Sequence, residues 1–152
     1  LASFVVAVQM SGAIPVVLEG PADQEPVDRL LRLCGNPPIV LKGLDLLTVA
    51  GVLAQARLFV GQDSGITHLA GLMGVHTVAL FGPTDPDRWA PQGTHVAVVQ
   101  GAPCLCSSWS DVIRCQEKPC LVIQQDHLVA RCFAHLNEAS ASAENPVRLP
   151  CH

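Results

Sequence analysis

The sequence contains no tyrosine and only two tryptophans, and aromatic residues make up 4% of its 152 residues. Any hydrophobic core must therefore be built mainly from aliphatic side chains. Charged residues are also few, at 14%, against a hydrophobic fraction of 49%. This balance is typical of a globular chain and excludes a disordered one. The length suits one domain that can bury a sizeable core.

The sequence also lacks an excess of basic residues and a long hydrophobic run. Nine Lys and Arg against thirteen Asp and Glu give a net charge of -4, which argues against a nucleic-acid partner. No apolar run reaches the ~18 residues that a membrane span needs. The first twenty residues lack the basic start of a signal peptide. They also lack an initiating Met, so we expect the chain to begin within a longer protein.

Seven cysteines are a high count, and their odd number without a visible secretion signal favours a reducing compartment. Four of them lie close together as C-x-C-x8-C-x4-C: Cys104, Cys106, Cys115 and Cys120. Four thiolates could bind a structural zinc ion, although the spacing differs from that of standard paired C-x2-C sites. Zinc, free thiols and disulfides therefore remain alternatives. Cys34 and Cys132 fall on predicted helices and are expected to be buried as small hydrophobic residues.

Short apolar runs alternate with helix-like segments along residues 1–100. The pattern predicts strands near 14–18, 37–41, 58–61, 77–81 and 95–99. It predicts helices near 1–11, 24–34, 45–55, 67–73 and 121–136. Strands that are apolar on both faces indicate a parallel sheet covered by helices. The predicted fold class is therefore α/β, with a Rossmann-like, doubly wound parallel sheet.

Some predictions concern single residues. Asp23 is expected to cap the helix near 24–34. The helix near 45–55, which starts at Asp45 or Thr48, is expected to bury its apolar residues. Trp89 and Trp109 are expected to lie in or at the edge of the core. The residues predicted to be buried in the helix near 45–55 are Leu46, Leu47, Val49, Val52 and Leu53.

Residues 61–74, GQDSGITHLAGLMG, place an unusual set of polar side chains where a predicted strand leads into a helix. Ligands collect at the carboxyl ends of parallel strands. The unpaired amides and partial positive charge of a helix N-terminus suit a phosphate, and glycines such as Gly65 let a ligand approach the backbone. His68 could add a proton-dependent charge, while Asp63 could accept hydrogen bonds from sugar hydroxyls. Together these features indicate a diphosphate that carries a sugar.

A simpler interpretation of this stretch has about equal weight. Asp63 or Ser64 could only cap the helix, and His68 could be a packed core residue. A serine hydrolase is discounted, because Ser64 stands one place too late for the G-x-S-x-G elbow. The segment that follows the next strand, FGPTDP at 81–86, shifts the balance. It combines Gly82, which permits close approach, with the hydroxyl of Thr84 between stiffening prolines.

These two segments, DSGITHLA at 63–70 and VALFGPTDP at 78–86, closely resemble glycosyltransferase family 9, which includes the lipopolysaccharide heptosyltransferases. The resemblance extends more loosely to about residue 136. Pro91 matches the last proline of the family pattern. Two residues depart from it, because Gly71 replaces the usual alanine and His76 stands where proline is common.

The resemblance implies a GT-B fold, of which residues 1–136 would be the C-terminal half that binds the nucleotide-sugar donor. This domain would lack its first strand and would include a Cys-rich segment at 101–120, and residues 137–152 are expected to be a frayed tail. The donor would resemble ADP-heptose, and no metal or other cofactor would be required. Carried over by position, the implied donor-binding residues are Asp63, Ser64, Gly65, Ile66, His68, Gly82, Thr84, Leu44 and Glu25, with Leu44 near the base and Glu25 near the ribose.

The resemblance also implies that no catalytic residue lies in this chain, since the base belongs to the N-terminal domain. The glycolipid acceptor would bind that domain, so the isolated chain is expected to be inactive. The whole enzyme would be cytoplasmic, at the inner face of the bacterial inner membrane, with which it could make peripheral contact. Two other classes stay open at this point. One is a non-catalytic nucleotide-binding module, and the other is a structural or interaction domain organised by the cysteine cluster.

Overall fold

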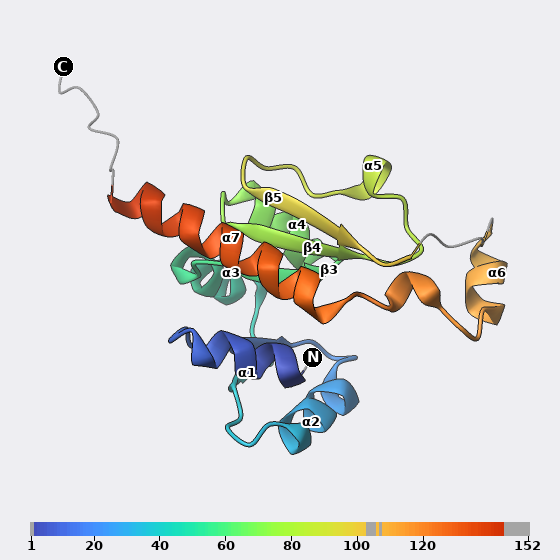
Figure 1. Ribbon diagram of the computed structural model, residues 1–152, viewed down its shortest axis with the longest axis horizontal. Coiled ribbons are helices and arrows are strands. Elements are labelled where there is room, and N and C mark those ends of the chain that lie inside the picture. Colours follow the sequence, from blue (N-terminus) through green and yellow to red (C-terminus); the bar gives the residue numbers. More distant parts are fainter. Residues whose placement is uncertain (1, 103–105, 107, 145–152) are drawn as a thin grey trace. The chain divides into compact units, whose positions relative to one another are not determined.

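The computed structural model describes residues 2–102, 106 and 108–144. Within it the chain divides into two compact units, Leu1–Val49 and Ala50–His152. Helices and strands alternate as far as β5, Val96–Gln100 (Figure 1), which confirms the predicted α/β class. All strand pairs are parallel, and they form a two-stranded sheet in the first unit and a three-stranded sheet in the second.

The first unit is built around two parallel strands. Val16 of one strand pairs with Ile39 of the other. Its core is the cluster of Val5, Leu30 and Cys34, against which Val17 packs. Its elements are α1 Ala2–Met10, β1 Val16–Glu19, α2 Gln24–Leu33 and β2 Ile39–Lys42, and α3 Leu46–Gln55 spans its boundary with the second unit.

Local side-chain chemistry sets the ends of the helices in this unit. Gly12 follows α1 with a φ of 83°, a left-handed conformation that favours glycine and ends the helix. Asp23 occupies the N-cap position of α2, as predicted, but its carboxylate makes no capping hydrogen bond and accepts from the Gly20 amide instead. Asp45 does cap α3, accepting from the Thr48 amide at 2.8 Å. That backbone hydrogen bond lowers the pKa of Asp45.

The second unit places β4 between β3 and β5, both parallel to it. Val78 is paired with Val60 on one side and with Ala97 on the other. Because the three strands run in the same direction, the segments that follow them emerge at one edge of the sheet. The elements of this unit are β3 Phe59–Gln62, α4 Gly65–Leu72, β4 Thr77–Phe81, α5 Pro86–Trp89, β5 Val96–Gln100, α6 Trp109–Arg114, a 3-10 turn at Pro119–Leu121, and α7 Gln125–Glu144.

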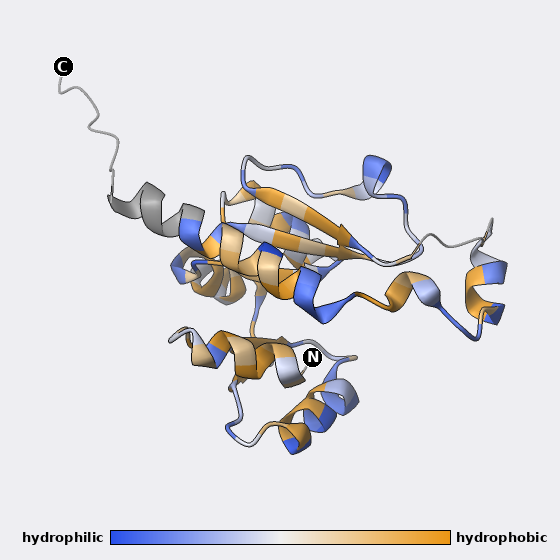
Figure 2. Cartoon of the chain, in the orientation of Figure 1, coloured by the Kyte–Doolittle hydropathy of each residue, from blue (hydrophilic) through white to orange (hydrophobic). Residues whose placement is uncertain are grey.

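The three strands of this sheet are predominantly apolar (Figure 2), and β4 is buried along nearly its whole length. Figure 1 shows α7 crossing the front of the sheet, with α4 behind it. On α7, Leu128, Cys132 and His135 are buried, at the i, i+4, i+7 spacing of one helical face. The predicted burial of Cys34 and Cys132 is confirmed.

Several burial predictions are wrong. Leu46 and Leu47 are exposed, whereas Val49 and Leu53 on the same helix are buried, as predicted. Trp89 and Trp109 are also exposed. Trp89 instead lies under the guanidinium of Arg88, whose central carbon is 5.4 Å from the ring centre, in a cation–π contact.

The last helix is longer than the sequence pattern indicated. α7 continues to Glu144, past residue 136, after which the sequence analysis expects a frayed tail. Residues 145–152 of that expected tail lie outside the described residues. Within the part of the chain that the structure describes, no helix combines the length and hydrophobicity needed to cross a membrane.

The burial pattern of α3 gives a direct test. Leu53 is 1% exposed, so Leu53→Ala should lower the free energy of unfolding by about 2–5 kcal/mol through lost burial and a residual cavity. Leu47, on the same helix, is 84% exposed, and Leu47→Ala should change it by less than about 0.5 kcal/mol. Denaturant unfolding of both variants measures this difference. Equal losses would contradict the orientation of α3.

Candidate functional site

The segment between β3 and α4 carries the polar residues that the sequence analysis singled out. β3 ends at Gln62 and α4 begins at Gly65, two residues before the predicted start at Thr67. The amide of Asp63 donates to the Leu80 carbonyl at 3.2 Å, which ties this turn to β4. Ser64 is the N-cap residue of α4, with an extended backbone. The turn therefore lies at the carboxyl edge of the parallel strands, as predicted.

The side chain of Thr67 holds the turn between β3 and α4 in place. Its side chain is completely buried, and its hydroxyl donates to the carbonyl of Gln62, the last residue of β3. The Ser64 hydroxyl lies 3.0 Å from the Thr67 hydroxyl and accepts from the Thr67 amide at 3.4 Å. The strand end and the first turn of α4 are thus joined through one side chain. This role of Thr67 could not be predicted, because the burial of its side chain cannot be seen from a single sequence.

Gly61, in β3, and Gly65, at the start of α4, have different roles. Neither Gly61 nor Gly65 is among the glycines with positive φ, so both have ordinary backbone conformations. A Cβ on Gly61 would lie 2.5 Å from the Phe59 ring and 2.7 Å from the Thr67 hydroxyl, so this glycine makes room for both side chains. A Cβ on Gly65 would meet no atom within 4 Å. Only Gly65 therefore leaves open space in front of the backbone for a ligand.

The start of α4 has the features of an anion site. The first amides of an α-helix have no acceptor within the helix, and Ser64 takes up only that of Thr67. The amides of Gly65 and Ile66 therefore suit an anionic group. His68 lies one turn on, with Nε2 3.8 Å from a carboxylate oxygen of Asp63. Both side chains are partly exposed, so this contact is weak and leaves them able to meet a ligand.

The loop after β4 lies at the same edge, next to the turn after β3. Thr84 is half-buried, and Asp85 caps α5 by accepting from the Asp87 amide at 3.0 Å. The expected approach of a ligand to Gly82 stays a prediction, and the structure shows a packing reason for this glycine as well. A Cβ at Gly82 would lie 2.5 Å from a methyl group of Leu121, so this glycine makes room for Leu121. The backbone carbonyl of Gly82 accepts from the Gln100 side chain at 3.5 Å.

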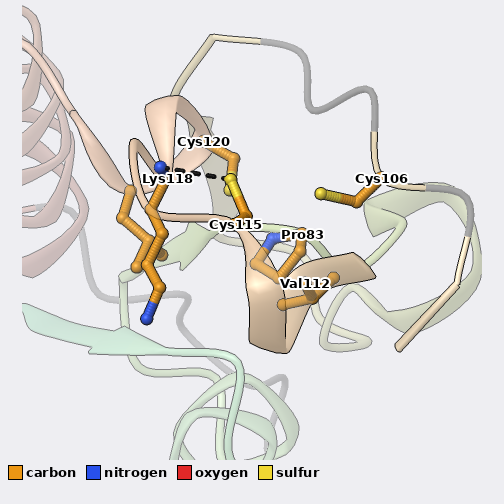
Figure 3. A pocket seen from close by; sticks show the side chains of 7 residues that line it. Pro83, Cys106, Val112, Cys115, Lys118 and Cys120 are labelled. Carbon is orange, nitrogen blue, oxygen red and sulfur yellow. Dashed lines mark hydrogen bonds between the residues drawn. The ribbon is translucent and has the colours of Figure 1, made fainter. Parts of the chain in front are cut away.

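The described end of the Cys-rich segment, around Cys120, packs against this same edge, which could not be predicted from the sequence. A Cβ at Gly101, directly after β5, would lie 2.4 Å from the carbonyl oxygen of Cys120. The segment forms a small pocket beside the loop after β4 (Figure 3). The residues that line this pocket are Pro83, Cys106, Val112, Cys115, Lys118, Cys120 and Leu121.

The zinc alternative for the cysteines stays a prediction. Across residues 2–102, 106 and 108–144, no three His, Cys, Asp or Glu side chains are arranged so that they could hold a metal ion. Cys104, the fourth proposed ligand, lies outside the described residues. The Cys115 sulfur accepts from the Lys118 amide at 3.3 Å, and Lys118 has a left-handed backbone with φ 42°.

Two residues that the resemblance assigns to the donor belong to the first unit. Leu44 is partly exposed and lies between β2 and α3. Glu25 is exposed in the first turn of α2. Their roles toward base and ribose stay predictions. In the second unit the structure brings together the turn at 63–65, the start of α4 and the loop at 82–86.

Comparisons with known proteins agree with this geometry. Residues 4–118 match the sequence model of Glycosyltransferase family 9 (heptosyltransferase). Because the match covers well over half of the chain, the chain belongs to this family. The resemblance stated from the motifs at 63–70 and 78–86 is thereby confirmed.

Two curated relatives match parts of the chain. It is 45% identical over 65 residues to lipopolysaccharide heptosyltransferase 1 of Pseudomonas aeruginosa, which is 43% of this chain and 18% of that protein. It is 36% identical over 89 residues to lipopolysaccharide heptosyltransferase 3 of Escherichia coli, which is 56% of this chain and 26% of that protein. The matched segments therefore span about a quarter or less of these relatives.

Two solved structures share the fold. A glycosyl transferase family 9 protein from Veillonella parvula superimposes with a TM-score of 0.79 and 26% identity, covering 90% of this chain and 40% of its own. The Escherichia coli ADP-heptose lipopolysaccharide heptosyltransferase II gives 0.75 and 20% identity, covering 91% and 41%. The second likeness shows the fold alone. This chain corresponds to less than half of either structure.

The role of Thr67 can be tested by two variants of similar size. Thr67→Val removes the hydroxyl and leaves the Gln62 carbonyl without its donor, which should cost about 1–3 kcal/mol of unfolding free energy. Thr67→Ser keeps the hydroxyl, so it should retain more of the wild-type stability than Thr67→Val. Denaturant unfolding of both proteins measures this order. If Thr67→Ser were the less stable variant, packing of the methyl group would outweigh the hydrogen bond.

Proposed function

We propose that this chain is the donor-binding part of a glycosyltransferase that transfers a heptose-like sugar from a nucleotide diphosphate. The observation that carries the proposal is the start of α4, where Ser64 accepts only from the Thr67 amide, a Cβ on Gly65 would meet no atom within 4 Å, and the partly exposed Asp63 carboxylate lies 3.8 Å from His68. Membership of the family supports the reaction class. The names of the relatives, which refer to lipopolysaccharide and to ADP-heptose, support the choice of donor and acceptor.

In this proposal the diphosphate binds at the start of α4. The helix amides and the partial positive charge of the helix donate to the phosphate oxygens. His68 is close enough to add a positive charge when it is protonated, and Thr84 on the neighbouring loop adds a hydroxyl. As the bond to the sugar breaks, the leaving diphosphate gains negative charge. The same donors then stabilise that charge.

Asp63 serves the sugar rather than the phosphates. A carboxylate beside a diphosphate is repelled by it, whereas a carboxylate beside sugar hydroxyls accepts their hydrogen bonds. The tie between the Asp63 amide and β4 keeps this carboxylate at the edge of the sheet. Asp63 therefore contributes to the choice of donor sugar, while Gly65 and Ile66 hold the part that every nucleoside diphosphate shares.

The family resemblance assigns the remaining parts of the reaction to an N-terminal domain. A base in the N-terminal domain would deprotonate the acceptor hydroxyl, which then displaces the diphosphate at the anomeric carbon. That domain would also hold the glycolipid acceptor, close to the inner face of the bacterial inner membrane. Leu44 and Glu25, in the first unit, would contact the nucleobase and the ribose of the donor.

Backbone amide shifts during an ADP titration, followed by NMR, test the proposed site. Shifts are expected at residues 61–68 and 82–86, because both segments lie at the carboxyl edge of paired strands. Shifts around Leu44 and Glu25 would support the assignments in the first unit. Parallel titrations with UDP and GDP identify the preferred base. Shifts confined to other parts of the chain would contradict the site.

Two variants separate the phosphate role from the sugar role. Gly65→Val should abolish the ADP-induced shifts without unfolding the chain, since its Cβ enters open space that the diphosphate would fill. Asp63→Ala should bind ADP nearly as well as wild type but bind ADP-heptose more weakly. Asp63→Ala with equal affinity for both ligands would remove the proposed sugar contact.

A further inference from the structure

Three histidines from different parts of the second unit meet at the amino edge of its sheet. His76 directly precedes β4, His95 directly precedes β5, and His135 lies on α7. His76 is 8% exposed and His135 is 9% exposed, so both are buried. The turn at 63–65 and the loop at 82–86 follow the carboxyl ends of their strands, so this histidine cluster lies at the other edge of the sheet.

The three rings are in direct contact. His76 and His95 are stacked, with ring centroids 4.3 Å apart and planes at 22°. His76 and His135 meet edge to face at 5.6 Å, and their Nδ1 atoms lie 3.3 Å apart. The last distance is that of a hydrogen bond between two imidazoles whose positions in the sequence differ by 59 residues. It joins α7 to the central strand of the sheet.

This contact limits how many protons the pair can hold. A hydrogen bond between two Nδ1 atoms needs a donor on one ring and a bare nitrogen on the other. If both rings were protonated, two N–H groups would face each other and two positive charges would share a buried contact. The bonded pair therefore takes up at most one proton, whereas two separated imidazoles take up two.

We propose that His76, His95 and His135 form a proton-sensitive clamp that fastens α7 to the sheet at neutral pH and releases it in acid. The ordinary imidazole pKa is about 6.5. Below this pH the open state binds more protons than the clamped state, so the equilibrium moves toward opening as pH falls. For each proton that the clamped state excludes, the equilibrium constant for opening rises about tenfold per pH unit below this pKa. By pH 5 the total rise is about thirty-fold.

Three ionisable groups that the structure describes lie on or beside the clamp: Cys132, Arg57 and His95. On α7, burial raises the pKa of the Cys132 thiol to about 11, so it carries no charge in this pH range. Arg57 donates to the carbonyl of Leu136, next to His135, at 3.4 Å. Its positive charge opposes a second imidazolium nearby. The His95 ring, stacked on His76, would oppose it as well if it were protonated.

Amide hydrogen exchange in α7 measures the clamp in the intact chain. Protection factors for residues 128–136, corrected for intrinsic exchange, should fall about thirty-fold between pH 8 and pH 5 in the wild type. The double variant His76→Phe with His135→Phe keeps aromatic rings but removes the hydrogen-bonded imidazole pair, so its protection should vary much less with pH than that of the wild type. His127, exposed on the same helix, gives the matched control, and His127→Phe should behave as wild type.

A second measurement covers the case in which the double variant does not fold. Imidazole nitrogen shifts of the wild type should show the His76–His135 pair taking up its second proton only as α7 loses protection. If both rings became cationic with α7 protection unchanged, the clamp would be refuted. It would equally be refuted if wild type and a folded double variant lost protection alike. The proposal does not rest on the proposed donor site.

Discussion

The parallel pairing of β4 with a strand on each side is the constraint on which the rest of the second unit depends. Three strands with one direction send their following segments to one edge, and this places the turn at 63–65 beside the loop at 82–86. The hydroxyl of Thr67 then joins the end of β3 to the first turn of α4 and leaves Gly65 facing open space. The opposite edge receives His76 and His95, against which α7 packs.

Much of this arrangement could be predicted from the sequence, since it depends on local patterns. The five apolar runs gave the strands, and the range predicted for β4, 77–81, equals its observed bounds. The polar residues after β3 and β4 indicated the edge of the sheet at which a ligand is expected to bind. The family resemblance rested on the same two motifs. The start of α4 was placed two residues late, because the capping role of Ser64 was left open beside a ligand role.

The rest depends on contacts between distant residues, which no local pattern reports. Gly82 looked like a point of ligand approach, yet the missing side chain makes room for Leu121. Leu46 and Leu47 have the composition of a buried helix face but lie on its outer side. His76 was noted only as a departure from the family pattern, since its partner His135 lies far along the sequence. The packing of Cys120 against Gly101 was invisible for the same reason.

The structure of the complete protein with ADP bound would test the central claim most directly. The account predicts that phosphate oxygens lie within about 2.7–3.2 Å of the amide nitrogens of Gly65 and Ile66, the range of an N–H···O hydrogen bond. It also predicts that the Asp63 carboxylate is directed toward the position of the sugar. A diphosphate bound away from the start of α4, in the cysteine-lined pocket or elsewhere, would contradict the account.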